Sequence, residues 1–465
     1  MDNITYKLKE LEVPSEEPFR FDALKREPSV EAVSSLISEL SGPFVLAIDS
    51  PWGTGKTTFV RMLKSVLEKK EHPCLYFNAW ETDFSTDPLV AFLGEITKLI
   101  SDEIDNSSDT AKKVNKVKKL GSLLVKKGIP VLAKVTTGAT LDLDSFTEKA
   151  IADYVSSAAT DAVDKYLKEK ELIDEFHKEL DKVIKQLSQE GKPSQLVIFV
   201  DEIDRCRPTY AVELLERIKH LFNIENVIFV VSLDKQQLRT SLGAVYGQGI
   251  DADEYLRRFI DLEFLLPKPD AEAFTESLFK RFELGRIFSS HEYYNTQHDQ
   301  RSFQKLFADL SGCFGLSLRA MEHCFTRILV AILTSEKGDI PSPYLLTILT
   351  ILRINALEVY RRFALEGGNV KDVMEYVKSN NGGVQLVESE IGLAIERQLI
   401  MAKCSMVYGL PEEAQAYKKV ISDTSSTKIE KKRAEYIVKS LENIPYFTPP
   451  LDYAVSQLEL AAQFK

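Results

Sequence analysis

A strand-like apolar run leads directly into a glycine-containing loop near the start of this chain. Residues 44–48 are apolar, and residues 50–57 read Ser-Pro-Trp-Gly-Thr-Gly-Lys-Thr. The loop matches the phosphate-binding pattern Gly-x-x-x-x-Gly-Lys-Ser/Thr except at its first position, where Ser50 replaces glycine. Apolar side chains at helical spacing then predict a helix that starts at Lys56, with its positive N-terminus facing bound phosphates.

The residue types in this loop suit the binding of a nucleoside triphosphate. Gly53 and Gly55 let backbone N–H groups approach phosphate oxygens without a Cβ in the way. Lys56 would reach the β- and γ-phosphates, and the hydroxyl of Thr57 would ligate Mg²⁺. The residues expected to contact the nucleotide are Ser50, Pro51, Trp52, Gly53, Thr54, Gly55, Lys56, Thr57 and Thr58.

A second apolar run, residues 196–200, ends in the acid pair Asp201-Glu202. In nucleotide hydrolases such an Asp holds Mg²⁺, here together with Thr57, and the adjacent Glu polarises the attacking water. Phosphoryl transfer needs this arrangement because its catalysis is mainly positioning and charge neutralisation. An acid pair after a strand is a weak signal alone, but downstream of a phosphate loop it predicts a hydrolase.

Further candidates follow the acid pair, each with an ordinary alternative. A third strand-like run ends at Ser232, which is either a γ-phosphate sensor or a simple strand-end serine. Asp234 is expected to cap the next helix, since Asp is a preferred N-cap residue.

Three arginines are candidates for contact with the transferred phosphoryl group. Arg257 and Arg258 precede the last strand-like segment, 259–265, and are either an arginine finger offered across a subunit boundary or a solvated basic pair. Arg319 opens a later helix and would touch the γ-phosphate from a helical lid, unless it forms a surface salt bridge.

Composition narrows the class of protein. The chain has 465 residues, 44% hydrophobic and 28% charged, which is typical of a multidomain globular protein. A net charge of −11 argues against a protein that coats nucleic acid. Its five cysteines are scattered and are expected to be free, buried thiols in a reduced, cytoplasmic compartment. No apolar run approaches the roughly 20 residues that span a bilayer.

The pattern of strands, helices and breakers predicts an α/β protein with helical additions. The expected parts are a leader over 1–27, a core in two pieces over 28–100 and 191–267, a helical insert over 101–190, a helical lid over 268–366 and a C-terminal helical domain over 367–465.

Three motifs together resemble the KAP family of P-loop NTPases, whose bacterial members include plasmid-encoded phage-exclusion proteins. They are residues 52–57 with the tryptophan inside the loop, Phe77–Glu81, and Val200–Cys206. The resemblance implies an additional-strand P-loop core, an AAA-related parallel sheet with a large insert, and ATP- and Mg²⁺-dependent hydrolysis coupled to conformational signalling. It also implies that Asp204 and Arg205 belong to the active-site or subunit-contact network, whereas spacing alone would leave them as a surface pair.

Two departures from the family pattern matter. Many members lack a glutamate at the second acidic position. Because Glu202 is the better general base, the expectation of hydrolysis is stronger for this chain than for those members. Many also carry paired transmembrane helices within the insert, and this chain instead has residues 110–141, with eight lysines and no acid. This basic amphipathic stretch is a solvated arm, a membrane-surface contact, a nucleic-acid contact or a protein-binding segment.

The expected function is therefore a cytoplasmic, Mg²⁺-dependent ATPase that acts as a nucleotide-driven switch, as a homo-oligomer that signals to an effector protein, in the setting of phage defence. The alternatives are a nucleotide-binding scaffold with little hydrolysis, a nucleic-acid motor that uses the basic insert, and a membrane-surface protein that uses the same insert.

Overall fold

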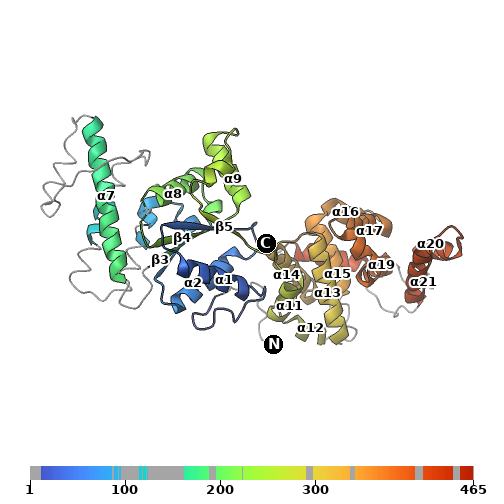
Figure 1. Cartoon of the computed structure of the whole chain (residues 1–465). Coiled ribbons are helices and arrows are strands. Elements are labelled where there is room, and N and C mark those ends of the chain that lie inside the picture. The colour runs from blue at the N-terminus through green and yellow to red at the C-terminus, as the bar shows by residue number, and fades with distance from the viewer. Residues whose placement is uncertain are drawn as a thin grey trace. The chain divides into compact units, whose positions relative to one another are not determined.

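The computed structural model forms two compact units, a sheet unit over Leu11–Pro267 and a helical unit built mainly from Lys268–Lys465 (Figure 1). The described residues are 12–85, 88–92, 94–95, 115–117, 119–121, 123, 162–187, 195–221, 224–289, 297–335, 341–403, 412–442 and 451–463.

The sheet unit is built on five strands in the order β2-β3-β4-β1-β5, and every neighbouring pair is parallel. Strand β4 therefore lies between β1, which leads into the phosphate-binding loop, and β3, which ends in the acid pair. This inserted strand and the parallel sheet confirm the predicted fold class. The strands are β1 Phe44–Asp49, β2 Cys74–Asn78, β3 Leu196–Asp201, β4 Val227–Leu233 and β5 Leu262–Leu265.

Helices cover both faces of this sheet. The helical elements of the unit are α1 Glu27–Glu39, α2 Lys56–Lys69, α3 Ala79–Thr82, α7 Ala162–Leu187, the 3₁₀ turn η2 Ile203–Arg205, α8 Pro208–Leu221, α9 Lys235–Tyr246 and α10 Ala252–Leu256.

Alternate side chains of each strand enter two separate cores. Helices α1 and α2 lie on one side of the sheet, and α8 and α9 lie on the other (Figure 1). On β3, Val197 and Phe199 pack in the core with α1 and α2, whereas Ile198 and Val200 pack in the core with α8 and α9. Both faces are buried, which explains why the central strands read as continuous apolar runs.

The last strand is shorter than the sequence predicts. The expected segment 259–265 is a strand only from Leu262. Phe259 and Ile260 instead continue a helical turn after α10, since their N–H groups donate to the carbonyl of Leu256 at 2.9 and 3.1 Å. Both side chains are buried, so an aromatic and β-branched pair that favours a strand also satisfies a buried turn.

The helical insert is described only in part. Within it, Nζ of Lys116 pairs with Glu175 at 2.9 Å and with Glu179 at 3.1 Å, both on α7. Residues 110–141 contain no acidic side chain, and Lys116 is instead paired with two glutamates of α7. The other lysines of that stretch, apart from Lys119, lie outside the described residues; they are Lys112, Lys113, Lys118, Lys126, Lys127 and Lys134.

In the described part of the helical unit all regular elements are helices, as predicted. Its core includes a cluster of phenyl rings in which Phe307 and Phe325 meet edge to face at 4.4 Å. The helices are α11 Ala271–Arg281, α12 Leu284–Ser289, α13 Gln297–Cys313, α14 Leu318–Leu333, α15 Pro343–Asn355, α16 Leu357–Ala364, α17 Val370–Lys378, α18 Gly383–Glu388, α19 Glu390–Lys403, α20 Glu412–Ser422, α21 Lys428–Glu442 and α22 Leu451–Ala461.

Two expectations from composition can be compared with the described residues. Cys74, Cys206, Cys313 and Cys324 are buried and free, as predicted, whereas Cys404 lies outside the described residues. Among the described helices, none combines the length and the apolar character needed to cross a bilayer.

Candidate nucleotide-binding site

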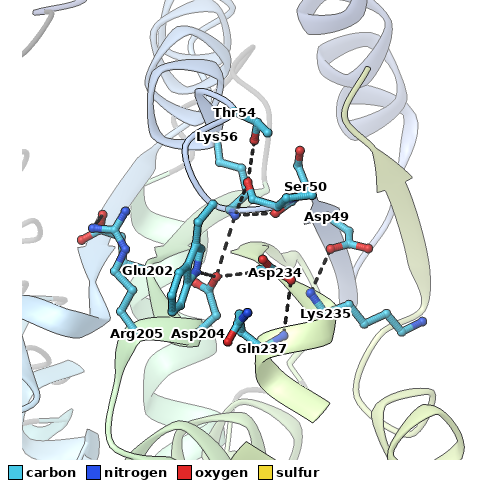
Figure 2. Close-up of polar contacts among 12 residues, drawn as sticks. Asp49, Ser50, Thr54, Lys56, Glu202, Asp204, Arg205, Asp234, Lys235 and Gln237 are labelled. Atoms are coloured by element: carbon cyan, nitrogen blue, oxygen red, sulfur yellow. Dashed lines mark hydrogen bonds and ion pairs between the residues drawn. The ribbon is translucent and has the colours of Figure 1, made fainter. Parts of the chain in front are cut away.

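The predicted phosphate-binding loop connects the end of β1 to the start of α2 at the carboxyl edge of the sheet (Figure 2). Gly53 and Gly55 have φ angles of 73° and 90°, in the left-handed region that glycine adopts without a steric cost. The backbone N–H of Ser50 donates to the carbonyl of Leu233 at 3.2 Å, which fixes the start of the loop to β4. Helix α2 begins at Lys56, as predicted, so the free N–H groups of its first turn face the loop.

Lys56 is held inside the loop. Its Nζ donates to the carbonyl of Ser50 at 2.5 Å and to that of Pro51 at 3.4 Å, and it lies 3.8 Å from Oδ2 of Asp204. Burial lowers the pKa of the Lys56 ammonium, and the charge of Asp204 opposes that shift. A phosphate group bound in the loop would therefore lie close to the Lys56 ammonium.

Asp204 connects three parts of the site (Figure 2). Its Oδ2 accepts hydrogen bonds from Nε1 of Trp52 at 2.6 Å and from the backbone N–H of Asp234 at 2.9 Å, in addition to its ion pair with Lys56. The side chain is only 2% exposed. Burial raises the pKa of the Asp204 carboxyl, while Lys56 and the indole N–H of Trp52 act in the opposite direction. Asp234 caps α9 through the N–H groups of Gln236 and Gln237, as predicted.

The acid pair lies at the carboxyl end of β3. Asp201 has the same strand parity as Phe199, so its carboxylate lies on the α2 side of the sheet, and it is 1% exposed. The hydroxyl of Tyr76 donates to Asp201 Oδ2 at 2.8 Å. Tyr76 was not predicted as a site residue; its one signal is a position on β2, the strand beside β3.

Glu202 occupies an unusual backbone position. Its φ of 60° lies in the left-handed region, which is uncommon for residues other than glycine. Its carboxylate pairs with Arg205 at 2.6 Å and accepts from Nδ2 of Asn78 at 3.4 Å. Burial raises the pKa of the Glu202 carboxyl, and the charge of Arg205 opposes that shift.

Ser232 is fully buried at the end of β4, where it pairs in register with Ile48 of β1. It shares the strand parity of Ile228 and Val230, which places it on the α2 side with Asp201. Among the described residues its Oγ has no hydrogen-bond partner. A buried hydroxyl without a partner is uncommon in native proteins, and it fits a position that a ligand or its water completes.

The residues present fit a Mg²⁺ ion. A buried carboxylate, Asp201, and the hydroxyl of Thr57 in the first turn of α2 are hard oxygen donors on one side of the sheet. No cluster of three or more His, Cys, Asp or Glu side chains with metal-binding geometry occurs among the described residues. That set suits a cation held by one carboxylate, a hydroxyl and the oxygens of a phosphate.

Among the described residues, none of the three predicted arginines forms a hydrogen bond or ion pair with the loop or the acid pair. Arg257 is mostly exposed and pairs with Glu254 at 3.2 Å, and Arg258 lies 6.0 Å from the ring of Tyr255, so their described contacts are local. Arg319 belongs to the helical unit, where it is the second residue of α14. Its contact with the γ-phosphate stays a prediction.

Arg26 also contacts the loop, and no sequence pattern indicates it. The residue is 4% exposed, and its Nη2 donates to the carbonyl of Thr54 at 3.3 Å. Burial lowers the pKa of its guanidinium, with Asp22 acting in the opposite direction.

The chain was compared with known proteins and solved structures. The uncharacterized protein MJ0182 of Methanocaldococcus jannaschii is 31% identical over 180 residues, which cover 34% of this chain and 89% of that protein. Structures of the Aeropyrum pernix ORC2 protein superpose loosely at 12% identity. The ADPNP–ADP complexes give a TM-score of 0.34 with 94% of each chain covered, and the ADP form gives 0.33 with 99% of this chain and 96% of that chain covered.

The family assignment depends on the sequence match rather than on those superpositions. The KAP family P-loop domain matches residues 26–348, which contain the loop, the inserted strand and the acid pair. This chain belongs to the KAP family of P-loop NTPases.

Proposed function

We propose that this protein binds Mg²⁺–ATP in the loop between β1 and α2, hydrolyses it, and uses the change of nucleotide state as a switch. The observation that supports this most directly is the strand order β3-β4-β1. It brings the acid pair, the phosphate-binding loop and the unpartnered hydroxyl of Ser232 to one edge of the sheet. Ligands of open α/β sheets bind at the carboxyl ends of the strands.

Each side chain has a defined task in this proposal. The backbone N–H groups of Gly53, Gly55 and the first turn of α2 bind phosphate oxygens, and Lys56 neutralises charge on the β- and γ-phosphates. Thr57 and Asp201 hold Mg²⁺, which when bound supplies further charge neutralisation. Glu202 takes a proton from the attacking water, and the hydroxyl of Ser232 donates to the γ-phosphate.

A second subunit completes the site in this proposal. Arg257 or Arg258 would enter from a neighbouring copy, because both are exposed and their contacts among the described residues are local. Arg319 would reach the nucleotide from the helical unit. We extend the family's phage-exclusion role to this chain as a cytoplasmic switch that signals to an effector protein.

The first experiment is steady-state ATP hydrolysis by wild type, Lys56→Ala and Glu202→Gln over a range of protein concentrations. The matched control is Lys64→Ala, which removes a partly exposed lysine of the same helix that pairs with Glu68. We expect turnover that rises with protein concentration and is lost in the first two variants only. GTP in place of ATP tests base preference, and equal activity in Glu202→Gln would refute the catalytic assignment.

A nucleotide-binding scaffold with little hydrolysis is the second candidate. It is favoured by the engagement of both Glu202 oxygens by neighbouring side chains. Tight ATP binding without turnover at any protein concentration would support it.

Roles for the basic insert stay predictions. ATPase stimulation by DNA or RNA that is lost when the lysines of residues 110–141 are neutralised would support nucleic-acid binding. Cosedimentation with anionic liposomes would support a membrane contact.

A further inference from the structure

Both carboxylate oxygens of Glu202 are occupied by neighbouring side chains. Oε1 lies 2.6 Å from Nη1 of Arg205, and Oε2 accepts from Nδ2 of Asn78 at 3.4 Å. A general base must lie within about 2.6–3.2 Å of the water whose proton it takes. A carboxylate has about four lone-pair sites, so Glu202 can still accept from water, but its pair with Arg205 fixes the orientation of the carboxylate and the positive charge makes it a weaker base. In this position Glu202 is a restrained base.

The two partners of Glu202 differ in the strength of their contact with it and in the other contacts that they make. The contact with Arg205 is a short, charge-assisted pair, the stronger class of hydrogen bond. The contact with Asn78 is long. Asn78 also caps α3 through the N–H groups of Trp80 and Glu81, and its Nδ2 donates to Glu81 at 2.9 Å. Asn78 therefore serves the local structure of α3, and Arg205 is the group that holds Glu202.

Arg205 has a second contact that fixes its guanidinium. Its Cζ lies 5.6 Å from the centroid of the Trp80 ring, within the range of cation–π attraction. The guanidinium thus binds both an anion and an aromatic face (Figure 2 shows its approach to Glu202). Trp80 is 53% exposed and the Arg205 side chain 27%, so an approaching molecule reaches this pair more easily than it reaches Asp201 or Asp204, which are 1% and 6% exposed.

We propose that Arg205 is a positioning residue that restrains Glu202, with Trp80 as the aromatic face on which its guanidinium rests. Opening of the Arg205–Glu202 pair frees the carboxylate to turn toward the attacking water and speeds hydrolysis, and a second subunit that attracts Arg205 would open it. This inference rests on the proposed role of Glu202 in hydrolysis.

The direction of the change in kcat distinguishes a residue that restrains Glu202 from a residue that takes part in catalysis. At saturating Mg²⁺–ATP, Arg205→Ala and Trp80→Ala should each raise kcat about two- to fivefold, the range expected when a partly exposed ion pair no longer has to be broken. Arg205→Lys keeps the charge and should restore most of the restraint. Arg239→Gln, which breaks the exposed Arg239–Asp253 pair of the same unit, is the matched control. A fall in kcat for Arg205→Ala would overturn the proposal, because a residue that stabilises the transition state or a subunit contact gives that result.

A second measurement does not depend on hydrolysis. The chain has two tryptophans, so Trp80 is the only indole in a Trp52→Phe background. Without nucleotide, both Arg205→Ala and Glu202→Ala should change the Trp80 emission in that background, because Glu202 holds Arg205 over the ring. Thermal unfolding confirms that each variant is folded.

Turnover and Trp80 emission together distinguish failure of the proposed hydrolase function from failure of the proposed restraint. Absence of turnover in every protein, Arg205→Ala included, would refute the hydrolase, while the emission still decides whether Glu202 holds Arg205. An unchanged Trp80 emission in Glu202→Ala would overturn the restraint whatever the turnover.

Discussion

The indole N–H of Trp52 donates to Oδ2 of Asp204 at 2.6 Å, across 152 positions of sequence. The same oxygen accepts from the N–H of Asp234 and faces Lys56. Trp52, inside the phosphate-binding loop, and Asp204, three residues after Asp201, are therefore hydrogen-bonded to each other. Through Asp204 the loop is connected to η2 and to the start of α9.

We expect Asp204→Ala to weaken nucleotide binding, because the loop loses its connection to the rest of the site. Loss of one partner from a buried hydrogen-bonded group costs about 1–3 kcal/mol, so Kd should rise about five- to a hundredfold. Calorimetric titration with Mg²⁺–ATP measures the change. Asp204→Asn, which keeps an acceptor oxygen but removes the charge, should have a smaller effect; equal affinity in Asp204→Ala and wild type would refute this role.

Ser232→Ala should separate stability from catalysis. Removal of a buried hydroxyl that has no partner leaves the free energy of unfolding unchanged or raises it by about 1 kcal/mol, whereas loss of a γ-phosphate contact lowers kcat by about tenfold or more. Denaturant unfolding and steady-state turnover measure the two effects. The control is Ser311→Ala in the helical unit, where the serine is also buried with an Oγ unpartnered among the described residues. Unchanged kcat in Ser232→Ala would leave Ser232 as an ordinary strand-end serine.

The exposed arginines allow a test of catalysis between subunits. Arg257→Ala combined with Arg258→Ala should abolish turnover and change the free energy of unfolding by less than about 0.5 kcal/mol, as is usual for exposed positions. A mixture of this double variant with Glu202→Gln should recover part of the activity, because some interfaces then combine an intact acid pair with an intact arginine. No recovery in the mixture, with normal oligomers by light scattering, would contradict donation from a neighbouring subunit.

The pH dependence of stability in the helical unit should follow Glu459 on α22. This carboxylate accepts from Nε and Nη2 of Arg353 on α15, both at 2.9 Å, and from the hydroxyl of Tyr360 at 2.8 Å. The hydrogen bonds from Arg353 lower the pKa of Glu459 below its ordinary value of 4.5. A carboxyl with a lowered folded-state pKa stabilises the fold above its unfolded-state pKa, and that contribution is lost as the pH falls through the folded-state pKa.

Thermal unfolding of wild type and Glu459→Gln between pH 3 and pH 8 tests this. We expect a constant deficit of about 1 kcal/mol or less for the variant above about pH 5, because the pair is partly exposed. The deficit should shrink as the pH falls below about 4.5. A deficit that grows towards acid pH would contradict the assignment.

The sequence by itself determined the elements that carry the site. A strand, a glycine-containing loop and a helix are encoded by consecutive residues, so the geometry of 44–69 follows from local patterns. The acid pair at the end of β3 and the cap at Asp234 are readable for the same reason. The parallel sheet with an inserted strand followed from the resemblance carried by the loop and acid motifs, and the structure confirms it.

Tertiary structure alone decided how these side chains meet. No local pattern indicates that Asn78 donates to Glu202, that Tyr76 donates to Asp201, or that Lys116 finds its acids on α7. The same holds for Phe259 and Ile260, which a strand and a buried turn accommodate equally well. Periodicity reports which face of an element is buried, but contacts between residues far apart in the sequence depend on how the elements pack, and packing is set by the whole core.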